Sequence, residues 1–340
     1  DQNQKSKIST NINSKSHYYT VTSIGVINTS TLYDNFTINK KVIDGETNVK
    51  SILSYDYDTK KISAYLSSDL DGVSIDLIEP WSKKKNDKVN FVLNYQNFPK
   101  KAYPLQINLD KNIFEFKHSK ENGYVKIKSP AARGILKYPL YKPEENTFSG
   151  SFEYIDTTYF SSNKFINYFP VINIQSKHVK TSDTIFDNVH LIMVPKDEYI
   201  EISKLDFKNL NLEMKSKGKW FTEGNQKTEI SADLKSDNFG AALKGIGYPN
   251  TIQGGKMSAN INSKWEGSLE KFTFVSSNSK IKMNIKDGQI NELDKGTQAI
   301  GQVLGLLSIA SIPKRLSLDF SDFFSKGLSF DDLKSEIAID

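Results

Sequence analysis

Apolar and polar residues alternate one by one along most of this chain, and this two-residue period limits its folds more than any other feature. In 62–66 and again in 230–234, isoleucine, alanine and leucine occupy every second position. Side chains of a β-strand point alternately to opposite faces, so the pattern predicts strands with one apolar and one wet face. Asn, Asp, Gly and Pro return at intervals of roughly 8 to 12 residues, which favours successive antiparallel hairpins.

Each alternating segment bounded by such residues predicts one strand. The predicted strands are 19–25, 62–66, 89–95, 105–109, 113–117, 124–128, 171–176, 186–194, 199–205, 210–214 and 230–234. The Asp-Gly pair within 43–46 predicts a hairpin turn. A short helix is predicted at 239–244, with Asp237 as its N-cap and Gly245 within its stop signal. The segment 165–170 favours either a short helix or an irregular crossover.

The apolar run 300–312 has a different period. Its side chains repeat at helical spacing on one side and are also apolar on the other, the two sets being Val303, Leu304 and Leu307, and Leu306 and Ile309. Pro313 ends the run, because proline has no N–H and its ring clashes with the preceding helical turn. The run predicts a helix within 293–312 that must be covered all round. Residues 316–320 then alternate as in a strand.

Composition excludes several classes of function. The 45 basic and 40 acidic residues are interspersed and leave a net charge of +5, so no strong basic surface for nucleic acid is expected. The chain has no cysteine and four scattered histidines, which excludes disulfides and argues against a metal site. No phosphate-binding loop, nucleophile elbow or dinucleotide fingerprint occurs. We therefore expect no enzyme, no cofactor and no metal.

Two groups of basic residues need an interpretation. The run from Lys83 to Lys88 is interpreted as a solvated hairpin loop without a function of its own. Lys314 and Arg315 follow the predicted C-terminal helix, where they either contact lipid phosphate or solvate the helix end. Both interpretations of that pair remain open.

Several motifs resemble the YhdP family, a group of large AsmA-like and TamB-like envelope proteins. Members carry a Leu-Gly-Leu-Leu helix, a Pro-(Lys/Arg)-Arg-Leu-Ser-Leu-Asp-Phe strand and a Phe-Ser-Lys-Gly turn, found here in this order at 304–307, 313–320 and 324–327. The segment 254–268 is similar to the same family. The segment 68–83 is also similar, with Trp81 where leucine is commoner. The resemblance covers most of 237–339 closely and the earlier chain more loosely.

The resemblance implies a fold and a function. The fold would be mainly β, a long curved antiparallel sheet of successive hairpins that forms a repeating β-groove, an open trough. We expect hairpin repeats in 1–195 and the C-terminal groove region in 196–340, with helices near 239–244 and 293–312. The implied function is phospholipid transfer between the inner and outer membranes through this groove. The alternative is a non-enzymatic docking module for envelope assembly that binds an outer-membrane partner.

Location and partners follow from the same resemblance. The implied location is the periplasm of a Gram-negative bacterium. The full-length protein would be held in the inner membrane by an anchor absent from this chain, and its C-terminal end would meet the outer membrane or a protein of it. Residues 1–13 are polar and the alternation continues to the last residues, so we expect this chain to be part of a longer protein.

The candidate site residues are the apolar residues at alternate positions of the predicted strands. A sheet with so little covering helix leaves an apolar face for something other than protein, and part of the set is expected to be packed core. The candidates for the lipid groove are Leu205, Phe207, Leu210, Leu212, Met214, Ile230, Leu234, Ile261, Phe272, Phe274, Ile281 and Ile285. The predicted C-terminal helix would close one end of the trough.

Overall fold

The computed structural model describes residues 7–13, 17–30, 42–77, 79–97, 103–140, 147–160, 170–181, 185–245, 252–272, 276–290 and 328–339. The chain divides into two compact units, Asp1–Tyr168 and Phe169–Asp340. The boundary predicted at residue 195 separates hairpin repeats from a C-terminal groove region, and it is not a boundary between compact units. It therefore stays a prediction.

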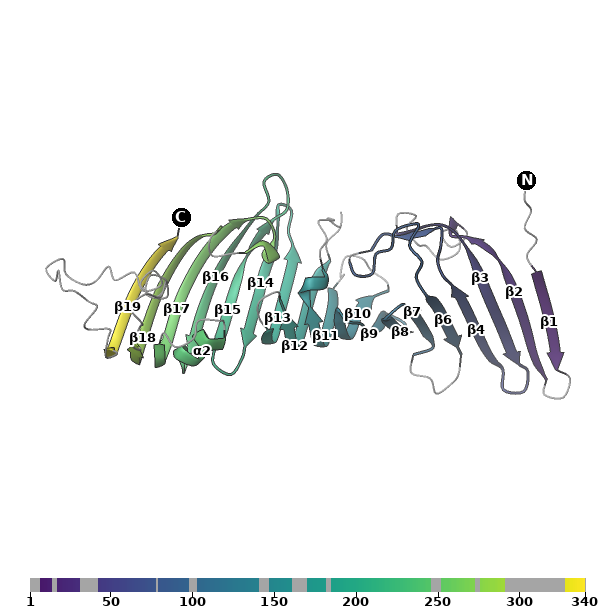
Figure 1. Ribbon diagram of the computed structural model, residues 1–340, viewed down its shortest axis with the longest axis horizontal. Coiled ribbons are helices and arrows are strands. Elements are labelled where there is room, and N and C mark those ends of the chain that lie inside the picture. The colour runs from purple at the N-terminus through teal and green to yellow at the C-terminus, as the bar shows by residue number, and fades with distance from the viewer. Residues whose placement is uncertain are drawn as a thin grey trace. The chain divides into compact units, whose positions relative to one another are not determined.

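The N-terminal unit is an antiparallel meander, in which each main strand pairs with the next along the chain (Figure 1). The short β5 stands outside this order and pairs with the first residues of β3. The elements are β1 (Lys7–Asn13), β2 (Tyr18–Asn28), β3 (Ile43–Asp56), β4 (Lys61–Ser68), β5 (Val73–Ile75), β6 (Phe91–Gln96), β7 (Leu105–Leu109), β8 (Asn112–His118), β9 (Asn122–Lys128), β10 (Ala132–Pro139), β11 (Thr147–Asp156) and the 3₁₀ turn η2 (Thr157–Tyr159).

The C-terminal unit is a second meander of longer strands, again paired in chain order (Figure 1). Its elements are β12 (Val171–Lys180), β13 (Ile185–Pro195), β14 (Tyr199–Lys208), β15 (Glu213–Phe221), β16 (Lys227–Ser236), α2 (Phe239–Gly245), β17 (Ile252–Glu266), the 3₁₀ turn η3 (Leu269–Lys271), β18 (Asn278–Ile290) and β19 (Leu328–Ile339). No pairing between described residues joins the first and last strands of this unit.

The fold class predicted from alternation is confirmed. Nearly every predicted strand coincides with an observed one, and the helix expected at 239–244 is α2. The strand predicted at 210–214 is an exception, because 210–212 form a turn and β15 begins only at Glu213. In β9 the side chains of Val125 and Ile127 are buried and their strand neighbours are more exposed, as a two-sided strand requires. The alternation therefore does specify strands, because only one parity can be apolar on a sheet with a wet face.

Two local predictions are wrong. Residues 43–46 are not a hairpin turn, because they continue β3 and pair with β5. Gly45 is needed there for close approach of two backbones, since a Cβ on it would lie 2.1 Å from the carbonyl oxygen of Gly72. The N-cap of α2 is Asn238 and not Asp237: its side-chain oxygen accepts the backbone N–H of Ala241 at 3.0 Å.

Residues 165–169, the helix predicted at 293–312 and the strand predicted at 316–320 lie outside the described residues, and Pro170 has no regular secondary structure.

Candidate functional site

Hydrophobic side chains of the C-terminal unit gather on one face of its sheet. Residues directly opposite each other on paired strands share a face. Leu234 lies opposite Met214 and Ala259, and Ala259 in turn lies opposite Met283. The neighbouring row on the same face consists of Ala232, Ile261, Ile281 and Ile337. We call this surface the apolar face.

The opposite face of the same strands is charged. Lys282 lies 3.5 Å from Glu336, and Lys264 lies 3.2 Å from Glu229. Most of these side chains are exposed, so each pair adds little stability, but together they keep this face in water. A shallow cavity of about 550 Å³ on this face is lined mainly by lysines, carboxylates and asparagines.

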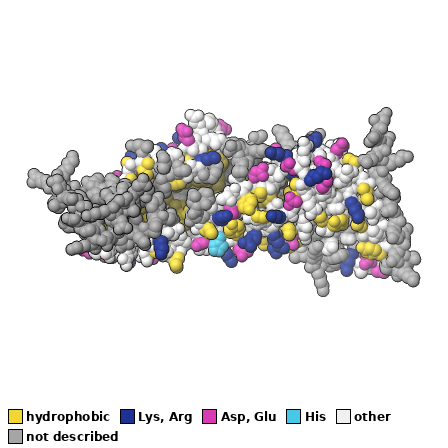
Figure 2. All heavy atoms as spheres, in the orientation of Figure 1, with side chains coloured by type: hydrophobic (Ala, Val, Ile, Leu, Met, Phe, Trp, Pro, Cys, Tyr) yellow, Lys and Arg dark blue, Asp and Glu magenta, His cyan; other side chains and the backbone are white. Residues whose placement is uncertain are grey.

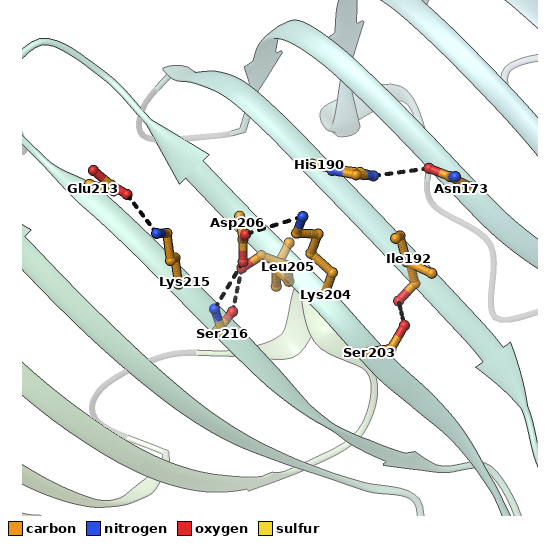
Figure 3. A network of polar contacts seen from close by, with 10 residues as sticks. All are labelled: Asn173, His190, Ile192, Ser203, Lys204, Leu205, Asp206, Glu213, Lys215 and Ser216. Carbon is orange, nitrogen blue, oxygen red and sulfur yellow. Dashed lines mark hydrogen bonds and ion pairs between the residues drawn. The ribbon is translucent and has the colours of Figure 1, made fainter.

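A bulge in β14 places both even-numbered and odd-numbered residues of that strand on the apolar face. Leu205 lies opposite Leu191, and Ile202 lies opposite Met193, so β14 holds one more residue than β13 between these pairs. Asp206 stabilises the bulge, because its carboxylate accepts the backbone N–H of Ser216 at 3.1 Å (Figure 3). Ile202 and Leu205 therefore share the apolar face although one has an even and the other an odd number.

His190 lies on the charged face, opposite Asp206 in the strand register. Its Nε2 is 3.0 Å from the side-chain oxygen of Asn173 (Figure 3). Burial lowers the pKa of His190, the nearby Lys204 lowers it further, and Asp206 opposes both effects. The neutral imidazole is therefore favoured, and this network supports the sheet from the side away from the apolar face.

Two short segments pack onto the apolar face near opposite ends of its strands. Leu243 of α2 joins a buried cluster that consists of Ile252, Met257, Ile285 and Ile290. Leu269 of η3 packs against a second cluster, which consists of Met193, Ile200 and Ile202. A central lane runs from one cluster towards the other, formed by Met214, Ser216, Ala232, Leu234, Ala259, Ile261 and Met283. Leu234, Ala259 and Met283 in this lane also pack against the α2 cluster. In Figure 2 hydrophobic side chains line a recessed surface of this unit.

Most of the predicted groove residues lie together on the apolar face. Those in strands on this face are Leu205, Phe207, Met214, Ile230, Leu234, Ile261, Ile281 and Ile285. Leu212 packs against the α2 cluster from the turn before β15. Phe272 lies beyond η3 with its ring 5.0 Å from that of Trp265. Ile285 is 0 % exposed, so it is packed core within the described fold.

Leu210 does not lie on the apolar face. It is 95 % exposed in the turn between β14 and β15, so its prediction as a groove residue is corrected. The remaining predicted residues lie outside the described part of the chain, namely Phe274, the helix residues Val303, Leu304, Leu306, Leu307 and Ile309, and the basic pair Lys314 and Arg315.

The N-terminal unit has an apolar face of its own, from which sequence reasoning chose no site residue. Val21 lies opposite Leu53, and Leu53 lies opposite Ala64. Tyr19 and Ile62 share this face, and Leu53 is 52 % exposed. The signal was present, since these residues alternate as clearly as those of the C-terminal unit.

The run from Lys83 to Lys88, between β4 and β6, was predicted to be a solvated basic loop, and this prediction is wrong for Lys83. Lys83 is only 5 % exposed, and its Nζ donates to the backbone carbonyls of Val73 at 2.7 Å and Lys84 at 2.9 Å. Burial lowers the pKa of Lys83, and the carboxylate of Asp87 opposes this effect. Lys88 is exposed and bridges two aspartates of the same segment. The buried lysine fixes the segment by hydrogen bonds to the backbone.

The side chains of the apolar face are mainly aliphatic, so this face can take apolar groups out of water. Within the described ranges, no group of three or more His, Cys, Asp or Glu side chains could bind a metal ion. No helix in that part of the chain is long and apolar enough to span a membrane.

Fold and face together define a class, that of antiparallel meander proteins with one apolar and one charged surface. Residues 113–340, more than half of the chain, match the family model described as YhdP protein. The chain therefore belongs to the YhdP family. It is also similar to the "Intermembrane phospholipid transporter YhdP" of Escherichia coli (strain K12), with 27 % identity over 119 residues. This match covers 35 % of this chain and 9 % of that protein, so the chain corresponds to a small part of it. No solved structure matches.

Proposed function

We propose that this chain carries phospholipids along its apolar face, as part of a longer periplasmic protein that bridges the inner and outer membranes. The observation that carries the proposal is the central lane of the C-terminal unit, an apolar strip between α2 and η3 on a sheet whose other face is charged. Acyl chains would lie along the strip, and head groups would stay in water at its margins.

Two further observations support this proposal. The chain belongs to the YhdP family, and the Escherichia coli relative is named as an intermembrane phospholipid transporter. The N-terminal unit has a second apolar sheet face, and part of that face is exposed. In this proposal the longer protein is anchored in the inner membrane and the C-terminal region meets the outer membrane. No catalytic group takes part.

Lipid content of matched variants tests the proposal. Ile261→Asp places a charge on the central lane, and Asn262→Asp places the same charge on the other face of the same strand. A charge in the path of an acyl chain is costly to desolvate, so Ile261→Asp should lose most of the phospholipid that co-purifies with the wild type. Asn262→Asp should keep it. Native mass spectrometry and circular dichroism measure lipid content and folding in the same samples.

Two outcomes would overturn the proposal. If folded wild-type protein carries no phospholipid from bacterial membranes or from added vesicles, the docking alternative is favoured. If Ile261→Asp loses lipid only to the extent that it unfolds, the lane is ordinary core.

A further inference from the structure

A cavity in the N-terminal unit lies at one rim of its sheet. Its volume is about 460 Å³, and it is lined by Pro80, Asn90, Asp110, Lys111, Asn112, Pro130 and Tyr159. These residues come from the ends of neighbouring strands and from the turns beside them: β7 ends at Leu109, and β8 begins at Asn112. The cavity is thus placed where the sheet meets solvent.

The cavity adjoins the apolar side of this rim. Asn112 lies opposite Leu109, which in turn lies opposite Phe91 on the apolar face of the unit. Phe114, two residues further along β8, is on the same face, and the ring of Trp81 packs edge-on against it at 5.8 Å. Pro80, the neighbour of Trp81, lines the cavity. An amphiphile with its tail against Phe114 would have its polar end at this cavity.

One polar group in the cavity has no hydrogen-bond partner within the described part of the chain. Asn112 donates from Nδ2 to the carbonyl of Leu109 at 3.1 Å, but its side-chain oxygen is buried and has no hydrogen-bond partner among the residues that the structure describes. A buried acceptor without a partner is unfavourable, and native proteins usually supply one. Water, or the N–H group of a ligand that enters the cavity, would supply the donor that this oxygen lacks.

The cavity also carries one charge of each sign. Lys111 is exposed and forms no ion pair within the described ranges. Asp110 accepts the backbone N–H of Asn90 at 3.0 Å, so its carboxylate is held in place. A ligand with a phosphate and a nearby ammonium group would match both charges, and its N–H groups would supply the donor that Asn112 lacks.

We propose that this cavity binds the head group of a phospholipid whose phosphodiester carries a primary ammonium, with Lys111 at the phosphate and Asn112 and Asp110 at the ammonium. The proposal rests on the proposed function, because it takes the tail on the apolar face to be a phospholipid acyl chain. It adds a head-group class. A trimethylated ammonium has no N–H and cannot satisfy Asn112, and a glycerol head group has no cation for Asp110.

Competition between two lipids tests this assignment. The purified chain is incubated with vesicles that contain equal amounts of phosphatidylethanolamine and phosphatidylcholine with identical acyl chains, and the bound lipids are extracted and measured by mass spectrometry. The wild type should prefer the ethanolamine lipid by on the order of tenfold, the factor expected for one hydrogen bond to a charged group. Total bound lipid is recorded separately from the ratio.

Three variants divide the roles of the cavity residues. Asn112→Leu should bring the ratio close to one while total lipid changes by less than about twofold. Asp110→Asn keeps an acceptor for Asn90 and should lower the ratio without a folding defect. Lys111→Gln should reduce binding of both lipids and leave the ratio unchanged, because both lipids share the phosphate. Lys120→Gln, the same change in the exposed turn between β8 and β9, is the control and should alter neither quantity.

The outcomes separate this inference from the proposed function. Bound lipid without a head-group preference, or a preference that survives both Asn112→Leu and Asp110→Asn, overturns the head-group site and leaves lipid transfer standing. Absence of any bound lipid overturns both. Loss of the preference in these two variants, with total lipid retained, supports the site.

Discussion

At the residue scale, burial separates two large apolar side chains that the sequence pattern treats alike. Ile285 is 0 % exposed in the cluster beneath α2, and Leu210 is 95 % exposed in a turn. Ile285→Ala should lower the free energy of unfolding by about 2 to 5 kcal/mol, as large-to-small changes in cores do. Leu210→Ala should change it by less than about 0.5 kcal/mol. Urea denaturation measures both, and equal effects would contradict the placement of these residues.

His190 should make stability depend on pH. Its pKa in the folded protein is lowered from 6.5 by burial and by Lys204, so the unfolded chain binds more protons in the range just below pH 6.5. The contribution of His190 to stability is therefore complete above pH 6.5 and is lost as the pH falls from 6.5 through the folded pKa. His190→Gln should lose less stability than the wild type between pH 7.5 and 5.5. Identical losses in urea denaturation at the two pH values would exclude this role.

Single residues could be predicted where alternation continues and not where it ends. The placement of Ile261 and Ile281 on the apolar face could be predicted from the alternation alone, because a strand has only two faces. Leu210 does not, because the side chain of Asn209 accepts the backbone N–H groups of Asn211 and Leu212 and turns the chain out of the strand. Lys83 could not be predicted as buried, since its partners are backbone carbonyls brought near by tertiary structure.

At the element scale, the bulge in β14 depends on Asp206. Its carboxylate accepts the N–H of Ser216, for which the bulge leaves no ladder partner at this point. Asp206→Ala should lower the free energy of unfolding by about 1 to 3 kcal/mol, the cost of a buried donor without an acceptor. Asp206→Asn retains a side-chain acceptor and should cost less. The prediction fails if the two variants have the same urea midpoint.

Strands were easier to predict than their junctions. Local alternation gives a strand its type, but the bulge exists only because β13 and β15 impose a register on β14 from both sides. The same reason explains 43–46, where pairing with the distant β5 extends β3 through an Asp-Gly pair that would favour a turn in isolation. Information of this kind resides in partners far along the chain.

At the scale of the whole molecule, the N-terminal unit has an apolar face of its own, whose large side chains are more exposed than those of the C-terminal unit. Leu53→Asp should reduce bound phospholipid and cost little stability, because Leu53 is 52 % exposed and packs against little protein. Asn48→Asp, a change of the same charge on the other face of β3, is the control. Thermal unfolding and lipid extraction measure the two effects. Unfolding that parallels the lipid loss would mean that Leu53 is structural.

The sidedness of lipid contact tests the central claim most directly. A photoreactive amino acid is placed in turn at Ile230 and Ile261 on the apolar face, and at their strand neighbours Ser231 and Asn262 on the charged face. The chain is irradiated in the presence of phospholipid vesicles, and lipid adducts are counted by mass spectrometry. Adducts at 230 and 261, with few at 231 and 262, are the predicted result. Equal labelling of both faces, or none on either, would contradict transfer along the apolar face.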